Sequence, residues 1–168
     1  MNPGLIGHSF GGYETSFIVT RTNIFATAIA GAPATDLTSW YLTVGWNTGR
    51  PEFWRFESQQ WRMGKSLFED MESYNRNSPI LHVKQITTPL LLWTGEVDKQ
   101  VNTNQSIEFY LALHRLEKQA TMLIYPKERH ALLKEENQKD LTKRIQNWFD
   151  YYLKDMQPQP WMLKDKKE

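Results

Sequence analysis

The sequence predicts an α/β fold in which a mainly parallel sheet carries helices on both faces. Short apolar runs bounded by glycine or proline alternate with longer segments whose apolar residues recur at helical spacing. This alternation of strand and helix is typical of parallel sheets. A G-x-S-x-G sequence at residues 7–11 stands at the junction of the first such strand and helix. In open α/β sheets reactive groups lie at the carboxyl ends of the strands, so the functional residues are expected there.

Length and composition set the scale of this fold. The 168 residues, of which 40% are hydrophobic and 13% aromatic, have the size of one domain with a sizeable core. With 20 basic and 19 acidic residues the net charge is +1, so no electric field favours nucleic acid or a membrane as a partner. Cysteine is absent, which excludes disulfides and thiol chemistry.

The first elements lie on either side of the G-x-S-x-G sequence. Leu5 and Ile6 form an apolar strand before it, and three apolar residues at helical spacing after it predict a helix that ends near residues 21–23. These three residues are Tyr13, Phe17 and Ile18. Residues 25–30 are expected to form a second buried strand, which Pro33 prevents from continuing.

Residues 34–64 show little periodicity and are rich in aromatic residues. Glycine and proline interrupt the segment, so loops and short helices are expected. The rings either cover the core or line a substrate pocket, and the sequence leaves both readings open. They belong to Trp40, Tyr41, Trp46, Phe53, Trp54, Phe56 and Trp61.

A helix and a strand are predicted next. Residues 65–74 have apolar side chains at helical spacing, and Pro79 with the two residues before it is expected to end the helix. The apolar positions of this helix are Leu67, Phe68, Met71 and Tyr74. Residues 90–95 are a continuous apolar run, which is typical of a strand buried on both faces.

The last part of the chain is expected to hold a helix, a strand and another helix. Residues 104–117 form a helix that Asn104 caps, residues 121–125 form a strand, and residues 135–153 form a helix. The expected core faces of the two helices consist of Ile107, Tyr110, Leu111 and His114, and of Leu141, Ile145, Trp148, Phe149 and Tyr152. Residues 1–153 then make up the domain, and residues 154–168 a loosely held polar tail.

Ser9 is the predicted nucleophile. In a nucleophile elbow the strand ends at the serine and a helix begins at once, so Gly7 and Gly11 are expected where side chains have no room. The turn directs the amino end of the helix at charge that develops beside Ser9. The backbone N–H of Phe10 is therefore one expected oxyanion donor.

The loops after two later strands hold candidates for the acid and the base. Asp98 follows the strand at 90–95, and His130 follows the strand at 121–125. The order serine, acid, histidine is the one that elbow-type hydrolases use. His130 is expected to take the proton of Ser9 while Asp98 holds the imidazole in the required tautomer. Glu96 lies in the same loop as Asp98 and competes for the orienting role.

The other histidines, His8, His82 and His114, are expected to be structural, because none follows a strand end in the required order. No histidine, aspartate or glutamate spacing typical of a metal site occurs, and no phosphate-binding loop follows a strand. No metal or other cofactor is therefore predicted.

Six segments resemble the catalytic domain of the prolyl oligopeptidase family of serine peptidases, which includes dipeptidyl and acylaminoacyl peptidases. They are residues 7–13, 30–36, 74–80, 88–92, 95–101 and 125–130. The resemblance implies a partial α/β-hydrolase fold, cleavage of oligopeptides through an acyl-enzyme, and a catalytic triad of Ser9, Asp98 and His130. Trp40 and Tyr41 fall near the positions where family members place aromatic residues of the pocket for the residue before the scissile bond.

The chain departs from the family at its start, because only eight residues precede Ser9. An α/β-hydrolase domain has several strands before the nucleophile strand, and a loop among them supplies the second oxyanion donor. We therefore expect the carboxyl-terminal part of a longer enzyme without its amino-terminal strands. Little activity is expected from residues 1–168 alone, together with either self-association through the exposed sheet edge or partial disorder around residues 1–12.

The resemblance implies a peptide substrate, without nucleic acid or membrane as partners. Two alternatives remain at this point. One is an esterase or lipase of the same fold, and the other is a non-catalytic interaction module that retains the triad.

Overall fold

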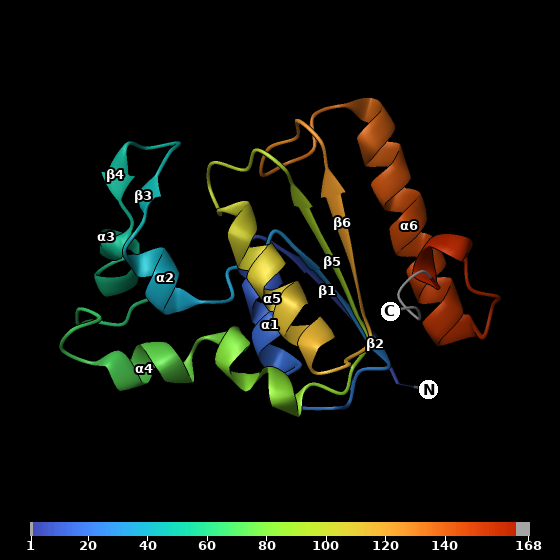
Figure 1. Cartoon of the computed structure of the whole chain (residues 1–168), viewed down its shortest axis with the longest axis horizontal. Coiled ribbons are helices and arrows are strands. Elements are labelled where there is room, and N and C mark those ends of the chain that lie inside the picture. Colours follow the sequence, from blue (N-terminus) through green and yellow to red (C-terminus); the bar gives the residue numbers. More distant parts are fainter. Residues whose placement is uncertain (1, 164–168) are drawn as a thin grey trace.

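The computed structural model describes residues 2–163 and contains, within them, a four-stranded sheet (Figure 1). The strands lie in the order β1-β2-β5-β6, and every neighbouring pair is parallel. Their bounds are Gly4–His8 for β1, Thr27–Gly31 for β2, Leu90–Gly95 for β5 and Ala120–Tyr125 for β6. The carboxyl ends of all four strands consequently meet at one edge, which is where the sequence predicted the functional residues.

Helices cover both faces of this sheet. Helices α1 (Phe10–Ile18) and α5 (Thr103–Arg115) pack on one face, together with the 3-10 helix η1 (Pro79–Gln85), and α6 (Glu135–Lys154) packs on the other (Figure 1). Alternate residues of β2 and β5 enter different clusters: Ala28, Ala30, Leu90 and Leu92 lie under α1 and α5, whereas Ile29 and Leu91 lie under α6. Burial on both faces explains why these strands are apolar without interruption.

Helix α6 covers its face of the sheet through Trp148. The side chain is 1% exposed, and its indole N–H donates to the hydroxyl of Thr27 at 2.6 Å. The ring of Trp161, in the short 3-10 helix η2 (Pro160–Met162), stacks on Trp148 with centroids 6.2 Å apart. This part of the predicted tail is thus held against the core cluster that contains Trp148, while residues 164–168 lie outside the described residues.

The segment between β2 and η1 forms a second packed region beside the sheet. It contains α2 (Leu37–Tyr41), a hairpin of β3 (Val44–Gly45) and β4 (Arg50–Pro51), α3 (Phe53–Glu57) and α4 (Met71–Arg76). We call it the aromatic region, because its buried cluster contains Trp40, Tyr41, Phe56 and Tyr74. Short helices were expected here, and the two-stranded hairpin was not.

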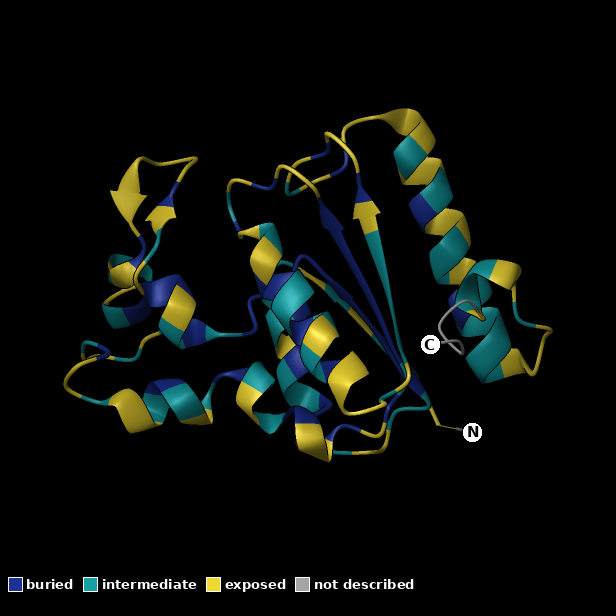
Figure 2. Cartoon of the chain, viewed as in Figure 1, coloured by how far each residue is buried: buried dark blue, intermediate teal, exposed yellow. Residues whose placement is uncertain are grey.

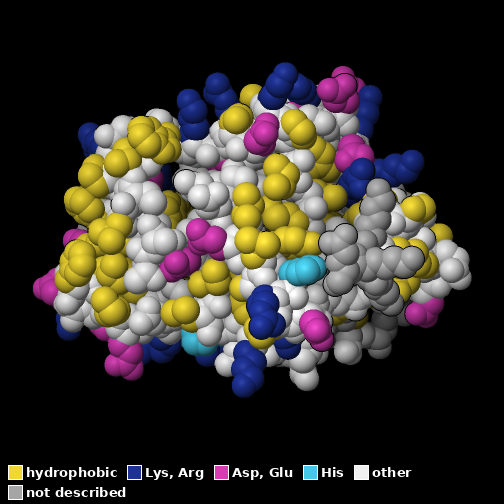
Figure 3. All heavy atoms as spheres, viewed as in Figure 1, with side chains coloured by type: hydrophobic (Ala, Val, Ile, Leu, Met, Phe, Trp, Pro, Cys, Tyr) yellow, Lys and Arg dark blue, Asp and Glu magenta, His cyan; other side chains and the backbone are white. Residues whose placement is uncertain are grey.

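Burial differs between the aromatic region and the sheet. In Figure 2, β2 and β5 are buried along their length, whereas the hairpin is largely exposed. Large apolar side chains remain exposed in the aromatic region, and Figure 3 shows hydrophobic side chains gathered at the left of the view, where this region lies. They include Leu42, Val44, Trp46, Phe53 and Phe68.

The helix predicted over residues 65–74 is wrong, because a helix begins only at Met71. The carboxylate of Asp70 accepts hydrogen bonds from the N–H and hydroxyl of Ser73 and so caps α4. In the turn before it, Glu69 accepts from the N–H and hydroxyl of Ser66. Phe68 is 73% exposed, so the helical spacing in this segment does not mark a buried face.

The cap and the core face predicted for α5 also need correction. The cap is Asn102, whose side chain accepts from the N–H of Asn104, and Leu111 is 56% exposed. The buried residues of this helix are Gln105, Ser106, Phe109 and Leu113. Gln105 is buried because its amide oxygen accepts from the backbone N–H groups of Thr35 and Asp36, at 2.9 and 2.8 Å.

Strand β1 lies at one edge of the described sheet, and Ile6 on it is 51% exposed. Self-association through this edge stays a prediction. Within residues 2–163, no helix has the length and apolar character needed to cross a membrane.

Candidate active site

Ser9 occupies a sharp turn between β1 and α1. Its backbone has φ 61° and ψ −120°, a conformation that costs energy for a residue other than glycine. Hydrogen bonds hold the turn, because the Ser9 N–H donates to the carbonyl of Gly31 at 2.8 Å and the Ser9 carbonyl accepts from Tyr13 at 3.0 Å. Phe10 begins α1, so its N–H belongs to the group that a helix leaves without an internal acceptor.

The glycines around Ser9 are not equivalent. A Cβ at Gly7 would lie 2.0 Å from the carbonyl oxygen of Gly11, and one at Gly12 would lie 2.4 Å from that of Gly31. A Cβ at Gly11 would meet nothing within 4 Å. The expectation for Gly7 is confirmed and that for Gly11 is wrong. The close approach of β1, β2 and α1 therefore requires glycine at Gly7 and Gly12, and not at Gly11.

The side chains of Ser9, His130 and Asp98 form one hydrogen-bonded chain. His130 Nε2 lies 2.7 Å from the Ser9 hydroxyl oxygen, and His130 Nδ1 lies 2.7 Å from Asp98 Oδ2. The Asp98 side chain is fully buried and that of His130 is 14% exposed. Asp98 Oδ1 accepts from the N–H groups of Gln100 and Val101 at 2.8 and 3.0 Å, which fixes the carboxylate. In the matching tautomer Nδ1–H donates to Asp98, and Nε2 accepts from the Ser9 hydroxyl.

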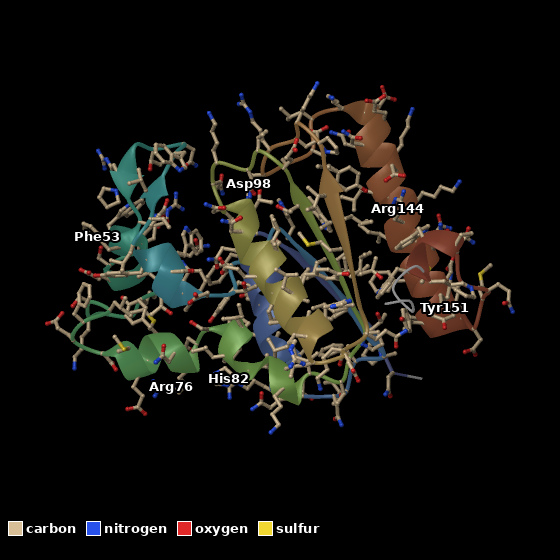
Figure 4. All side chains as sticks on the ribbon, in the orientation of Figure 1. Phe53, Arg76, His82, Asp98, Arg144 and Tyr151 are labelled. Atoms are coloured by element: carbon tan, nitrogen blue, oxygen red, sulfur yellow. The ribbon has the colours of Figure 1, made fainter. Side chains whose placement is uncertain are left out.

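The geometry also distinguishes the contacts of Asp98 from those of Glu96, the alternative orienting carboxylate. Glu96 Oε2 accepts from the backbone N–H of Lys127 at 2.9 Å. Asp98, in contrast, contacts His130 directly and lies where the loop from β5 turns toward α5 (Figure 4). Glu96 therefore ties the loop after β5 to the loop after β6.

A buried glutamate shapes the histidine loop. Glu128 is 1% exposed and its carboxylate accepts from Leu133 N–H at 2.7 Å, from Lys134 N–H at 3.0 Å and from the Asn137 side chain at 2.7 Å. These donors, the Leu133 N–H first, lower the pKa of Glu128. Glu128 was not among the residues predicted from the sequence.

His8 also contacts the histidine loop. Its Nε2 lies 2.9 Å from the backbone carbonyl of His130, and its ring stacks on Trp93 with centroids 4.9 Å apart. Desolvation lowers the pKa of His8, which favours its neutral form. The other two histidines contact different parts of the chain: His82 bonds the carbonyl of Arg76, near the foot of Figure 4, and His114 lies against Tyr110 on α5.

A small cavity opens beside Ser9. It is lined by Ser9, Phe10, Ala34, Trp40, Arg55, Gln60, Trp61, Gln100 and Val101. Of the two aromatic residues expected near a pocket, Trp40 lines this cavity and Tyr41 does not. The Tyr41 side chain is 4% exposed within the aromatic region, and its hydroxyl donates to Glu57. Trp61 is one of the rings for which the sequence left core and pocket both open, whereas Arg55 was not among the predicted site residues.

Within residues 2–163, no group of three or more histidine, aspartate or glutamate side chains is arranged to hold a metal ion.

Comparison with known proteins places these features in a family. Residues 2–156 match the family model described as the Prolyl oligopeptidase family. The chain belongs to the prolyl oligopeptidase family. The resemblance seen in the sequence is thereby confirmed.

Curated relatives support this assignment over most of the chain. The chain is 28% identical over 153 residues to the uncharacterized peptidase YuxL of Bacillus subtilis, covering 89% of this chain and 22% of the relative. It is likewise 28% identical over 153 residues to the rat acylamino-acid-releasing enzyme, covering 89% of this chain and 20% of that one. The chain therefore spans about a fifth of the length of the curated relatives it matches.

Solved structures show the same fold. A puromycin-hydrolyzing peptidase of Mycobacterium tuberculosis superposes with a TM-score of 0.79 at 25% identity, covering 93% of this chain and 22% of that one. Acylaminoacyl peptidase of Pyrococcus horikoshii gives 0.75 at 26% identity, covering 93% and 24%. The predicted α/β-hydrolase fold, with a mainly parallel sheet and helices on both faces, is confirmed.

Proposed function

We propose that the protein is a serine-type peptidase that cleaves oligopeptides through an acyl-enzyme. The observation that carries this proposal is the chain of two 2.7 Å contacts from Ser9 through His130 to Asp98. Family membership supports it, and relatives named as peptidases and acylamino-acid-releasing enzymes favour peptide substrates.

In this proposal Ser9 is the nucleophile and His130 the general base. The Ser9 oxygen bonds to the scissile carbonyl carbon as its proton passes to His130 Nε2, and the Phe10 N–H donates to the oxyanion that forms. His130 then gives the proton to the departing amine, and the C–N bond breaks. Water hydrolyses the resulting ester by the same steps and regenerates Ser9. Buried Asp98 stabilises the imidazolium throughout.

The cavity beside Ser9 is proposed to receive the side chain of the residue that supplies the scissile carbonyl. Its walls are largely apolar, with Trp40 and Trp61 contributing the largest rings. Aromatic walls of this kind suit the apolar part of a side chain. Tyr41 has no part in this pocket.

A fluorophosphonate probe on the full-length protein tests the nucleophile. We expect labelling that is lost in Ser9→Ala and strongly weakened in His130→Ala. Asp98→Asn is expected to lower kcat by about 10⁴-fold, because the imidazole then adopts the wrong tautomer. Ser16→Ala, in the same elbow helix, is the matched control and should label like the wild type. Equal labelling of Ser9→Ala would remove Ser9 as the nucleophile.

Peptidyl anilides compared with short acyl esters test the substrate class. We expect cleavage of both by the wild type. Ester cleavage without amide cleavage would replace the peptidase with an esterase, and no turnover with no labelling would leave a non-catalytic module.

A further inference from the structure

A second hollow adjoins the cavity beside Ser9. It lies next to α3, within the aromatic region at the left of Figure 1, and is open to solvent. It is lined by Arg55, Ser58, Gln59, Gln60 and Arg62, and we call it the arginine hollow. Arg55 and Gln60 line both spaces, so the arginine hollow borders the cavity beside Ser9. The described lining contains two cations and three neutral polar side chains, with no acidic or apolar one.

Arg55 is held in place at the junction of these two spaces. Its Nε lies 2.6 Å from Glu52 Oε2, its guanidinium lies 5.2 Å from the centre of the Trp54 ring, and its side chain is 16% exposed. Within residues 2–163, the guanidinium makes no other hydrogen bond, ion pair or ring contact. The two terminal amino groups of the guanidinium are therefore available as donors.

The charges around the hollow do not cancel. Glu52 is fully buried and compensates Arg55, but Arg62 is exposed and has no ion pair among residues 2–163. The two spaces thus offer several hydrogen-bond donors and an excess of positive charge.

We propose that the arginine hollow binds a carboxylate of the peptide substrate, carried by an acidic side chain on the acyl side of the scissile bond. This inference rests on the proposed function and adds a substrate class to it. Guanidinium groups match the geometry of carboxylates and can bind them through two parallel hydrogen bonds. A substrate that reaches from Ser9 past Arg55 meets these donors.

Peptide anilides in matched pairs test this preference. Each pair has glutamate or its isostere glutamine, either at the residue that supplies the scissile carbonyl or at the residue before it. We expect the full-length wild type to favour glutamate at one of the two positions by about tenfold in kcat/KM, which is the scale of one partly desolvated charge contact. The preference should decrease as salt concentration rises.

Binding of the same peptides to the Ser9→Ala variant gives a readout that needs no catalysis. Fluorescence polarisation should show the same glutamate preference in dissociation constant. If the wild type fails to react with the fluorophosphonate probe while this binding preference is present, the proposed function fails and the arginine hollow stands. If the probe labels Ser9 but neither position favours glutamate in binding or turnover, the hollow proposal is overturned.

Variants locate the preference. Arg62→Gln should reduce the glutamate preference about threefold, since an exposed charge contributes less than a buried one. The double variant E52M/R55M removes both partners of the buried pair without leaving an uncompensated charge, and it should abolish the preference. Arg50→Gln makes the same charge change on β4, outside both spaces, and should retain the preference in full. An undiminished preference in E52M/R55M would also overturn the proposal.

Discussion

The sheet and the aromatic region are built in different ways. Backbone geometry positions the functional side chains at the sheet, because the parallel strands end at one edge. Gly7, Gly12 and Gly95 allow neighbouring backbone segments to approach closely there. Packing between rings builds the aromatic region instead, as in the stack of Phe56 on Trp61 with centroids 5.3 Å apart. The comparison indicates that the sheet carries the proposed chemistry, while the aromatic region shapes the space that a substrate would enter.

The largest expected effect comes from Gly7→Ala, which tests whether close backbone packing positions the elbow on the sheet. The added Cβ would lie 2.0 Å from the Gly11 oxygen and 2.7 Å from the Thr15 hydroxyl, so the elbow must shift. We expect destabilisation above about 4 kcal/mol and loss of probe labelling.

Gly11→Ala is the matched control for Gly7→Ala. Its Cβ has open space within α1, and alanine is favoured over glycine in a helix by about 1 kcal/mol. Chemical denaturation of both variants checks this prediction. Equal destabilisation of the two would show that the crowding at Gly7 has been misjudged.

The sheet could be predicted from the sequence more fully than the aromatic region could. The elbow, the strands and the positions of Asp98 and His130 could be predicted, because buried parallel strands are marked by continuous apolar runs between breakers. The pocket could not, because Trp40 and Tyr41 are adjacent aromatic residues and only tertiary packing decides which one lines the cavity. The helix predicted over residues 65–74 failed for a similar reason. Local hydrogen bonds at Ser66 and Asp70 override helical spacing there.

The next effect contrasts two tryptophans. Trp148→Phe removes the indole donor to Thr27 in the sheet core, so we expect a loss of about 1–3 kcal/mol in unfolding free energy with unchanged probe labelling. Trp61→Phe should cost less stability, because its indole N–H has no acceptor among residues 2–163.

Trp61 does line the cavity, so its replacement should raise KM for peptide anilides by about threefold to tenfold. Urea denaturation and steady-state kinetics on both variants provide the measurement. If Trp148→Phe raised KM as much as Trp61→Phe, the division between the two regions would not hold.

Glu128→Gln tests whether a side chain, rather than strand geometry alone, positions His130. Glutamine presents an amide N–H to a site where three donors converge, so the loop should shift and labelling should slow by up to about 10²-fold. Glu136→Gln, on the exposed surface of α6, is the matched control.

The pH dependence of this effect has a defined sign. The pKa of Glu128 is lowered from 4.5 in the folded protein, so its stabilisation is complete above 4.5 and is lost as pH falls through the lower folded value. The stability difference between wild type and Glu128→Gln should therefore be constant near neutral pH and shrink in acid. Denaturation midpoints at several pH values measure it, and a pH-independent difference would contradict the assignment.

The smallest effect is expected at His8, where the sheet itself contributes a side chain to the histidine loop. His8→Phe keeps a ring against Trp93 but removes the contact with the carbonyl of His130, so we expect a loss below about 1 kcal/mol at neutral pH.

Desolvation holds the pKa of His8 below 6.5 in the folded protein. As pH falls through 6.5 the unfolded chain binds the proton first, so the wild type loses stability that His8→Phe does not lose. The advantage of the wild type should thus shrink between pH 7.5 and pH 5, by no more than about 0.5 kcal/mol because the ring is exposed to solvent. Urea midpoints at the two pH values measure the change, and His82→Phe, which also loses a contact with a backbone carbonyl, serves as the control. A His8→Phe variant with the same pH dependence as the wild type would show that His8 does not titrate differently on folding.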